Sequence, residues 1–228
     1  MKIEYMKDRI LESSSIARRM YGVKLTLTGK SSDASKWFLF NRDKLIFDIK
    51  LKQEGLVLDI GSYLGEYTER VLGKNPKMTF WLYEPIPSYF NACVNKFKNR
   101  ENVVVYQTAV SADGRDFQMH IDGLRSRQGS AASSEGVPVD SISIQEIFDS
   151  VSEIELLKMN IEGMEYECLE QLIHSNSLIK SKYLLIQFHN FEKESKDRRN
   201  ALRMDIERDF NNIYTFEWIW ELWIRKEE

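Results

Sequence analysis

Short apolar runs alternate along the chain with stretches in which apolar positions recur at helical spacing. Residues 56–60 are apolar except for Asp59, which is typical of a strand buried on both faces. The apolar positions of residues 64–72 then follow a helical period. The pattern predicts a buried strand that passes through a glycine turn, beginning at Gly61, directly into a helix.

The same reading predicts the order of the other elements. Strands are expected at 78–84, 103–110, 117–121, 154–161 and 183–188, with a last strand of alternating aromatic residues over 214–224, and helices at 87–98, after Gly163 and at 194–210. Alternating strands and helices favour a doubly wound α/β fold with a mostly parallel sheet. We expect this domain to span residues 51–228.

Residues 1–50 are expected to form an extension packed on that domain. An amphipathic pattern over 1–22 predicts a helix closed by Gly22, and short apolar runs over 23–49 predict a further helix and short strands. The stretch 122–136, rich in Ser, Gly and Ala, predicts a mobile loop.

Charge and cysteine content limit the classes of function. The formal net charge of the 228 residues is −3, which gives no general reason to expect nucleic-acid binding. Cys93 and Cys168 are too few for a disulfide framework and are expected to be buried thiols. No signal-peptide pattern or membrane span is evident, so we expect a soluble, cytoplasmic protein.

The strand–turn–helix at residues 56–72 indicates a cofactor site. Free amides at the start of a helix suit an anionic or polar ligand. Dinucleotide sites favour Gly-x-Gly-x-x-Gly, whereas the spacing here is Gly61-x-x-x-Gly65, and the side chain of Tyr63 would obstruct a pyrophosphate. S-adenosylmethionine needs no pyrophosphate site, and Glu84, at the end of the next strand, is placed to accept hydrogen bonds from both ribose hydroxyls.

Four segments together resemble the FkbM family of S-adenosylmethionine-dependent methyltransferases. They are Val57–Gly65, Tyr83–Pro85, Ala109–Ser111 and Leu157–Glu165, and the resemblance spans roughly residues 55–190. The Lys-x-x-x-Glu-Gly-x-Glu element in the last segment is the most specific part. The resemblance implies a Rossmann-like fold and, usually, O-methylation of a small metabolite or a sugar hydroxyl of a glycan.

The residues expected to contact the cofactor lie at the ends of three strands. They are Asp59, Gly61, Ser62, Tyr63, Gly65, Glu84, Pro85, Thr108 and Ala109. For Asp59 two roles stay open, since it can organise the glycine turn or receive the cofactor's ammonium group.

An alcohol acceptor must lose its proton, and His189 is our first candidate for the base. Glu162 and Lys158 are placed with it as catalytic residues, while a structural ion pair between Lys158 and Glu162 or Glu165 is the alternative. Substrate contacts are expected from Asn160, Glu165, Arg125 and Arg127; the two arginines would suit a phosphate or carboxylate if the 122–136 loop closes.

Two departures from the family pattern leave an alternative open. Asn160 and Gln187 stand where the family usually has carboxylates. An amide neither binds Mg²⁺ strongly nor takes a proton, so no metal site is predicted. Altered acceptor choice and a catalytically silent binding or assembly protein are both compatible with the change. An RNA methyltransferase is disfavoured by the acidic balance, and a homo-oligomer is possible.

Overall fold

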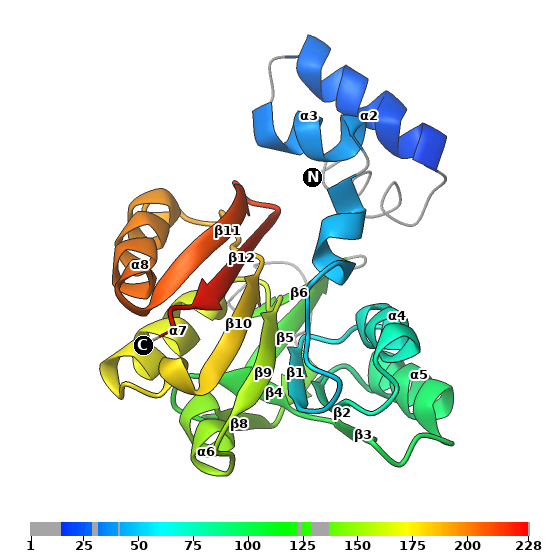
Figure 1. Ribbon diagram of the computed structural model, residues 1–228, viewed down its shortest axis with the longest axis vertical. Coiled ribbons are helices and arrows are strands. Elements are labelled where there is room, and N and C mark those ends of the chain that lie inside the picture. Colours follow the sequence, from blue (N-terminus) through cyan, green and yellow to red (C-terminus); the bar gives the residue numbers. More distant parts are fainter. Residues whose placement is uncertain (1–14, 29–31, 41, 123–124, 129–136, 228) are drawn as a thin grey trace.

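The computed structural model describes residues 15–28, 32–40, 42–122, 125–128 and 137–227. Its centre is a seven-stranded sheet of order β11-β12-β10-β9-β1-β2-β3 (Figure 1). These strands are β1 (Leu56–Ile60), β2 (Thr79–Tyr83), β3 (Val103–Tyr106), β9 (Ile154–Met159), β10 (Ser181–Ile186), β11 (Phe210–Phe216) and β12 (Trp220–Arg225). β3, β2, β1, β9 and β10 are parallel, and β12 is antiparallel to both of its neighbours. The expected mostly parallel sheet is confirmed.

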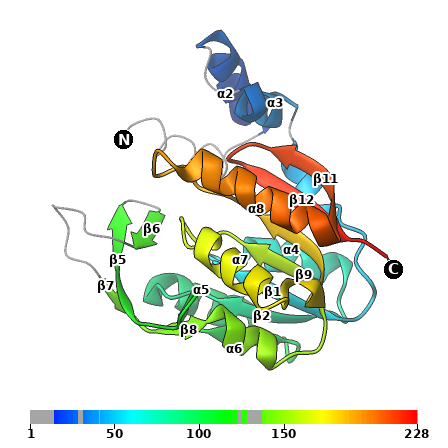
Figure 2. The ribbon, with the colours of Figure 1, turned by 90° about the vertical axis from the view of Figure 1, so that its left-hand side faces the viewer.

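Helices cover both faces of this sheet: the two sets lie on opposite sides of the strands in Figure 1, and Figure 2 looks onto one of the covered faces. On one face, α4 (Glu66–Lys74), α5 (Pro87–Phe97) and η1 (Arg42–Phe47) pack against the strand side chains that point to that side of the sheet. On the other face lie α6 (Ile144–Asp149), α7 (Glu165–His174), η2 (Leu178–Lys180) and α8 (Ser195–Asp209). Alternate residues of each strand are buried in the hydrophobic cores on the two faces of the sheet. Because both faces are buried, the strands are continuous apolar runs in the sequence.

The chain order places a topological switch point between β1 and β9. From β1 the chain moves outward through β2 and β3, and it later returns to the opposite side of β1 as β9. In open α/β sheets the crevice beyond the carboxyl ends of strands at such a point is where ligands bind.

Two smaller sheets flank the main one. β4 (Ala109–Ser111) pairs with β8 (Ser141–Ser143), and β5 (Phe117–Asp122) pairs with β6 (Arg125–Gln128) and β7 (Val137–Val139). The single strand predicted over 103–110 was therefore wrong. The chain leaves the main sheet after Tyr106 because the amide of Ala109 and the hydroxyl of Thr108 both donate to the carbonyl of Asp140.

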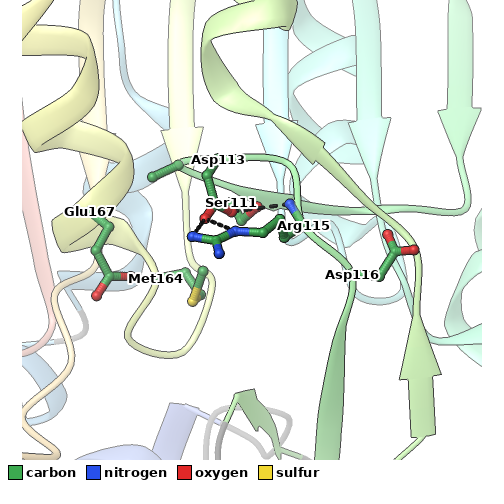
Figure 3. A pocket seen from close by; sticks show the side chains of 7 residues that line it. Ser111, Asp113, Arg115, Asp116, Met164 and Glu167 are labelled. Atoms are coloured by element: carbon green, nitrogen blue, oxygen red, sulfur yellow. Dashed lines mark hydrogen bonds and ion pairs between the residues drawn. The ribbon is translucent and has the colours of Figure 1, made fainter.

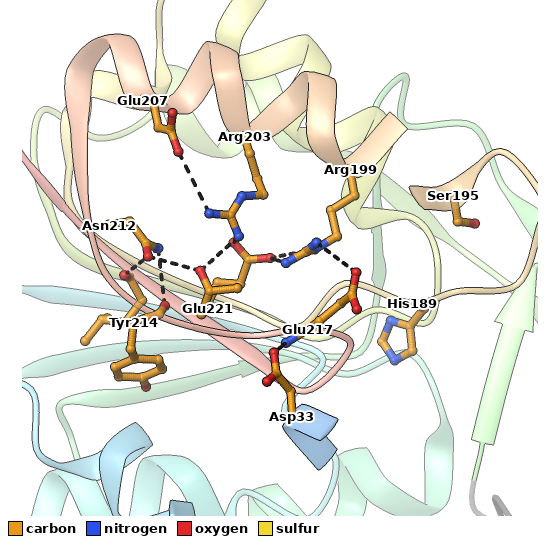
Figure 4. A network of polar contacts seen from close by, with 12 residues as sticks. Asp33, His189, Ser195, Arg199, Arg203, Glu207, Asn212, Tyr214, Glu217 and Glu221 are labelled. Carbon is orange, nitrogen blue, oxygen red and sulfur yellow. Dashed lines mark hydrogen bonds and ion pairs between the residues drawn. The ribbon is translucent and has the colours of Figure 1, made fainter. Parts of the chain in front are cut away.

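The predicted last strand, 214–224, is also wrong: it is a hairpin of β11 and β12. The chain reverses at residues 217–219, where Trp218 has a φ of 61° and the amide of Ile219 donates to the carbonyl of Phe216. Aromatic residues continue to alternate through the turn, so the sequence pattern gives no sign that the chain reverses there. Buried Arg199 and half-buried Arg203 of α8 both pair with the carboxylate of buried Glu221, which fastens the helix to the hairpin (Figure 4).

The short strands expected over 23–49 are absent from the described residues, which form α2 (Ser15–Leu27), α3 (Ser32–Leu39) and η1. Gly22 does not end the first helix but lies inside it. A Cβ at Gly22 would lie 2.5 Å from the amide nitrogen of Leu39, so glycine permits α2 and α3 to pack closely. Residues 1–14 lie outside the described residues.

The hairpin of α2 and α3 packs on the turn between β11 and β12. The rings of Trp37 and Phe216 are 4.9 Å apart, and the amide of Glu217 donates to Asp33. Because β11 runs parallel to β10, this turn lies at the same edge as the carboxyl ends of β1, β9 and β10. No helix in the described part of the chain is long and apolar enough to cross a membrane.

Candidate active site

Gly61 marks the centre of the candidate site, at the carboxyl end of β1. Its amide donates to the carbonyl of Tyr83, and the neighbouring strand end comes close, because the amide of Asn160 donates to the carbonyl of Ile60. The φ of Gly61 is 78°, and a Cβ there would lie 2.0 Å from the carbonyl oxygen of Asn160. Only glycine fits both the backbone conformation and this approach.

The turn after Gly61 leads into α4 through two further residues of positive φ, Tyr63 (51°) and Gly65 (70°). The ring of Tyr63 packs edge-on against Tyr89 at 4.5 Å, and Ser62 is buried. A Cβ on Gly65 would lie 2.7 Å from the ring of Phe97. The glycine at position 65 is thus explained by packing on α5, and the predicted strand–turn–helix is present.

Glu84 follows β2, and its side chain contacts the backbone of the turn between β1 and α4. Its carboxylate accepts hydrogen bonds from the amides of Tyr63 (2.9 Å) and Ile86 (3.0 Å). The side chain is buried, and this burial raises the pKa of Glu84 to about 7 although the two amides oppose the shift. A carboxylate has about four acceptor positions, so these two amides leave capacity for further donors. Pro85, half-buried, and Ile86 continue the same wall.

Asp59 and Lys158 form a buried ion pair directly beneath the turn. The Nζ of Lys158 lies 2.7 Å from Oδ1 of Asp59 and donates a 2.7 Å hydrogen bond to the carbonyl of Gly61. The hydroxyl of Thr68 on α4 donates to the other carboxylate oxygen of Asp59. Asp59 therefore organises the turn, one of the two roles left open for it. Lys158 pairs with Asp59 rather than with either of the glutamates considered from the sequence.

His189, three residues beyond β10, lies between two glutamates. Its Nδ1 is 3.0 Å from Oε1 of buried Glu165, and the same oxygen accepts a 2.7 Å hydrogen bond from the His189 amide. Its Nε2 is 3.5 Å from Oε2 of Glu162. The hydroxyl of Tyr166 donates to the His189 carbonyl at 2.7 Å. Glu165, for which a substrate contact is predicted, holds the histidine through this oxygen.

The two amides at the strand ends lie beside these groups. Asn160 directly follows β9 and Gln187 directly follows β10, and the Gln187 amide donates to the carbonyl of Met159. The side-chain oxygen of Asn160 is buried and has no hydrogen-bond partner among the described residues. A buried acceptor without a donor is unfavourable, so this oxygen suits a donor supplied by a ligand.

The other residues expected in the site are less directly placed. The hydroxyl of Thr108 is used by backbone oxygens, and Ala109 is buried in a small cluster with Ile86. Arg125 and Arg127 lie on β6, opposite Asp122 and His120 in the strand register with β5, rather than in the expected loop. Residues 123–124 and 129–136 of the expected loop lie outside the described residues.

Two positioning groups were missed in the sequence, namely Thr68 and Tyr166. Thr68 is fully buried on the apolar face of α4, and a polar residue on such a face was the available signal. Tyr166 lies at an apolar position of its helix, and that spacing says nothing about its hydroxyl.

A pocket of ≈ 410 Å³ adjoins the start of α7 (Figure 3). It is lined by Ser111 at the end of β4, by Ala112, Asp113, Arg115 and Asp116 of the β4–β5 connection, and by Met164 and Glu167. Arg115 is paired with Asp113, so the lining is acidic overall. Burial raises the pKa of Glu167. The volume is within the range of small-molecule sites.

Among the described residues, no group of three or more His, Cys, Asp or Glu is arranged to hold a metal ion. Cys93 and Cys168 are both buried free thiols, as expected.

Comparison with known families gives one match by sequence. The model of the methyltransferase FkbM domain matches residues 59–217, which is more than half of the chain and includes Asp59, Glu84, Lys158 and His189. A comparison with curated proteins found no match.

Solved structures share the fold. A methyltransferase FkbM from Methylobacillus flagellatus KT is 16% identical to this chain, with a TM-score of 0.56. The match covers 92% of this chain and 59% of that protein, so this chain spans less than two thirds of its length. A putative rRNA-methylase from Clostridium thermocellum (9% identity, TM-score 0.53) matches over 83% of this chain and 96% of its own. The fibrillarin pre-rRNA processing protein of Methanococcus jannaschii (13%, TM-score 0.50) matches over 79% and 70%. At these identities the likeness establishes the class I methyltransferase fold alone.

Proposed function

Because the chain belongs to the FkbM family of methyltransferases, whose cofactor is S-adenosylmethionine, we propose that it methylates a hydroxyl group of a small metabolite or a sugar. The observation that carries the proposal is the placement of a histidine, held by a buried glutamate, at the same sheet edge as the glycine turn. An alcohol acceptor needs a base to take its proton, whereas the cofactor is already activated by its sulfonium charge.

The residues at the turn fit S-adenosylmethionine. Glu84 retains accepting capacity for the two ribose hydroxyls, and the Asn160 side-chain oxygen is an unused buried acceptor suited to the cofactor's ammonium group or to the acceptor's hydroxyl. Half-buried Pro85 offers apolar surface for the adenine. The ion pair of Lys158 and Asp59 acts through the turn, because the Lys158 ammonium holds the carbonyl of Gly61.

His189 is proposed as the general base. A carboxylate only accepts hydrogen bonds, so its contact with Glu165 places the ring proton on Nδ1 and makes Nε2 the basic nitrogen. Nε2 lies on the side of Glu162, whose carboxylate can orient the acceptor hydroxyl and stabilise the imidazolium that forms. Lys158 is thereby reassigned from catalysis to positioning.

The acidic pocket beside α7 supports a small hydroxylated acceptor. Carboxylates such as Asp116 and Glu167 accept hydrogen bonds from sugar hydroxyls, whereas they repel the phosphates of RNA. Met164, in the pocket wall, directly precedes Glu165. We propose this pocket as the route by which the acceptor approaches His189.

A second candidate is a catalytically silent cofactor-binding or assembly protein. It is favoured by the amides Asn160 and Gln187, which stand where the family usually has carboxylates. This candidate predicts cofactor binding with no methyl transfer to any acceptor.

Mass spectrometry of the native host's metabolites and glycans, with and without this protein, tests the proposal. The expected result is a set of small hydroxylated molecules that gain one methyl group, as an ether, only when the protein is present. Variants His189→Gln and Glu162→Gln should each abolish that gain. Methylation confined to RNA, or no methylated product in any fraction, would contradict it.

A further inference from the structure

The helical hairpin of α2 and α3 carries exposed apolar side chains that its own fold does not use. Of the nine large hydrophobic residues found exposed in the described chain, four lie between residues 20 and 40: Met20, Val23, Leu27 and Phe40. Met20 is 68% exposed and Leu27 is 81% exposed. This density is high for such a short segment, and exposed apolar clusters mark interaction sites.

Three of the four form one stripe along α2. Met20, Val23 and Leu27 have the spacing i, i+3, i+7, which at about 100° per residue keeps them within roughly 60° of one another around the helix. Tyr21 and Leu25, which are buried against α3, occupy the opposite side. The stripe therefore faces away from the hairpin's own core.

Basic side chains border this stripe. Arg19 and Lys24 are exposed and project from the two sides of it, about 40° beyond its edges at 100° per residue. Residues 15–40 contain five Lys and Arg against one Asp, although the whole chain has a net charge of −3. The remainder of the protein is thus acidic, and the hairpin is a separate basic unit.

The apolar stripe and its basic borders together indicate an anionic lipid surface as the partner. Apolar side chains flanked by Lys and Arg are the pattern of a helix that lies in the interface of an anionic membrane, with the stripe among the acyl chains and the cations among the headgroups. Pairing of two copies through this face would bring together two basic surfaces, which disfavours a homodimer.

We propose that the α2 face defined by Arg19, Met20, Val23, Lys24 and Leu27 docks reversibly on anionic lipid surfaces. The hairpin stands out from the body of the molecule (Figure 1) and packs on the β11–β12 turn, at the sheet edge that carries Gly61 and His189. Docking would hold that edge near the membrane. The proposal does not depend on the chemistry assigned to the site.

Vesicle co-sedimentation of the full chain tests the proposal. Vesicles of phosphatidylcholine alone are compared with an equal mixture of phosphatidylcholine and phosphatidylglycerol, at low and at physiological salt. The protein should bind the anionic vesicles at least about tenfold more strongly than the neutral ones, and the difference should shrink with salt.

Two double variants and one control separate the contributions. Met20→Gln with Leu27→Gln, and Arg19→Glu with Lys24→Glu, should each reduce binding by about tenfold or more. Both variants leave buried Tyr21 and Leu25 unchanged, and circular dichroism checks that the fold persists. Met204→Gln on α8, where the methionine is 71% exposed, should leave vesicle binding unchanged.

Three outcomes would overturn the proposal. They are the absence of vesicle binding, equal binding to neutral and anionic vesicles, and a dimer in sedimentation equilibrium that the Met20→Gln/Leu27→Gln variant dissolves. The last result would assign the face to a second copy of this chain.

Discussion

One carboxylate oxygen, Oε1 of Glu165, holds both the backbone amide and the ring Nδ1 of His189, at 2.7 and 3.0 Å. Glu165 is fully buried and begins α7, while His189 follows β10, so this contact fixes the ring to the scaffold. The arrangement resembles the carboxylate–imidazole pairs that orient a general base.

Removing the base or its support should slow catalysis without loss of the cofactor. We expect His189→Gln to lower kcat by about 10²–10⁴-fold, the usual contribution of a general base. Glu165→Gln should lower kcat by at least about tenfold, because a neutral amide does not stabilise the imidazolium as a carboxylate does. Steady-state kinetics and S-adenosylhomocysteine titration measure the two effects. If either variant loses cofactor affinity in proportion to kcat, the residue supports the fold rather than the chemistry.

The buried pair of Asp59 and Lys158 should matter for stability. Lys158→Met leaves the Asp59 carboxylate buried without its cation, which typically costs about 3–5 kcal/mol. The double variant Asp59→Asn/Lys158→Met should recover part of the loss, since no buried charge remains. Urea unfolding measures these free energies. Lys77→Met is the control, because Lys77 and Glu54 form an exposed pair worth no more than about 1 kcal/mol.

Two glycines, Gly61 and Gly73, should respond in opposite ways to replacement by alanine. Gly61→Ala forces a Cβ to within 2.0 Å of the Asn160 carbonyl oxygen at a φ of 78°, so we expect lost cofactor binding and a destabilised fold. Gly73 lies in α4, and a Cβ added there would meet no atom within 4 Å, so Gly73→Ala should stabilise the protein by up to about 1 kcal/mol. Thermal unfolding and calorimetry distinguish them; a Gly61→Ala protein that binds cofactor normally would refute the geometry.

Burial of Glu84 should make the ligand-free protein less stable as pH rises. Its folded pKa of about 7 lies above the ordinary value of 4.5, so the folded state favours the protonated carboxyl. Its contribution is fully present below about pH 4.5 and is lost as pH rises through 7, by up to roughly 3 kcal/mol. Urea unfolding from pH 5 to 8 should show this loss in the wild type and a flatter profile in Glu84→Gln. Identical profiles for the two proteins would be inconsistent with a buried, titrating Glu84.

The parts of the site in and next to the strand–turn–helix of residues 56–72 were predictable from the sequence. The apolar run with Asp59 inside it, the glycine spacing and the acid after the second strand depend on local pattern, and all three lie where the pattern placed them. The partner of Lys158 was not predictable, because Asp59 and Lys158 are 99 residues apart and meet only through the parallel register of β1 and β9.

The misassigned regions share a physical cause, which is tertiary contact that overrides local pattern. Aromatic alternation runs through the turn at Trp218, and only the pairing of β11 with β12 reveals the hairpin. Gly22 resembles a helix end in sequence, but its role is the close approach of α3. The pattern of Val103–Val110 predicts one strand, but the hydrogen bond from the Ala109 amide to the Asp140 carbonyl places its second half in another sheet.

The most direct test of the central claim, that the edge formed by Gly61, Glu84 and Asn160 binds S-adenosylmethionine, is calorimetry with S-adenosylhomocysteine. We expect saturable binding to the wild type, an affinity lowered about tenfold or more by Glu84→Ala through loss of the ribose hydrogen bonds, and no change in the exposed control Glu101→Ala. Absence of binding to the wild type, or equal binding by Glu84→Ala, would contradict the account.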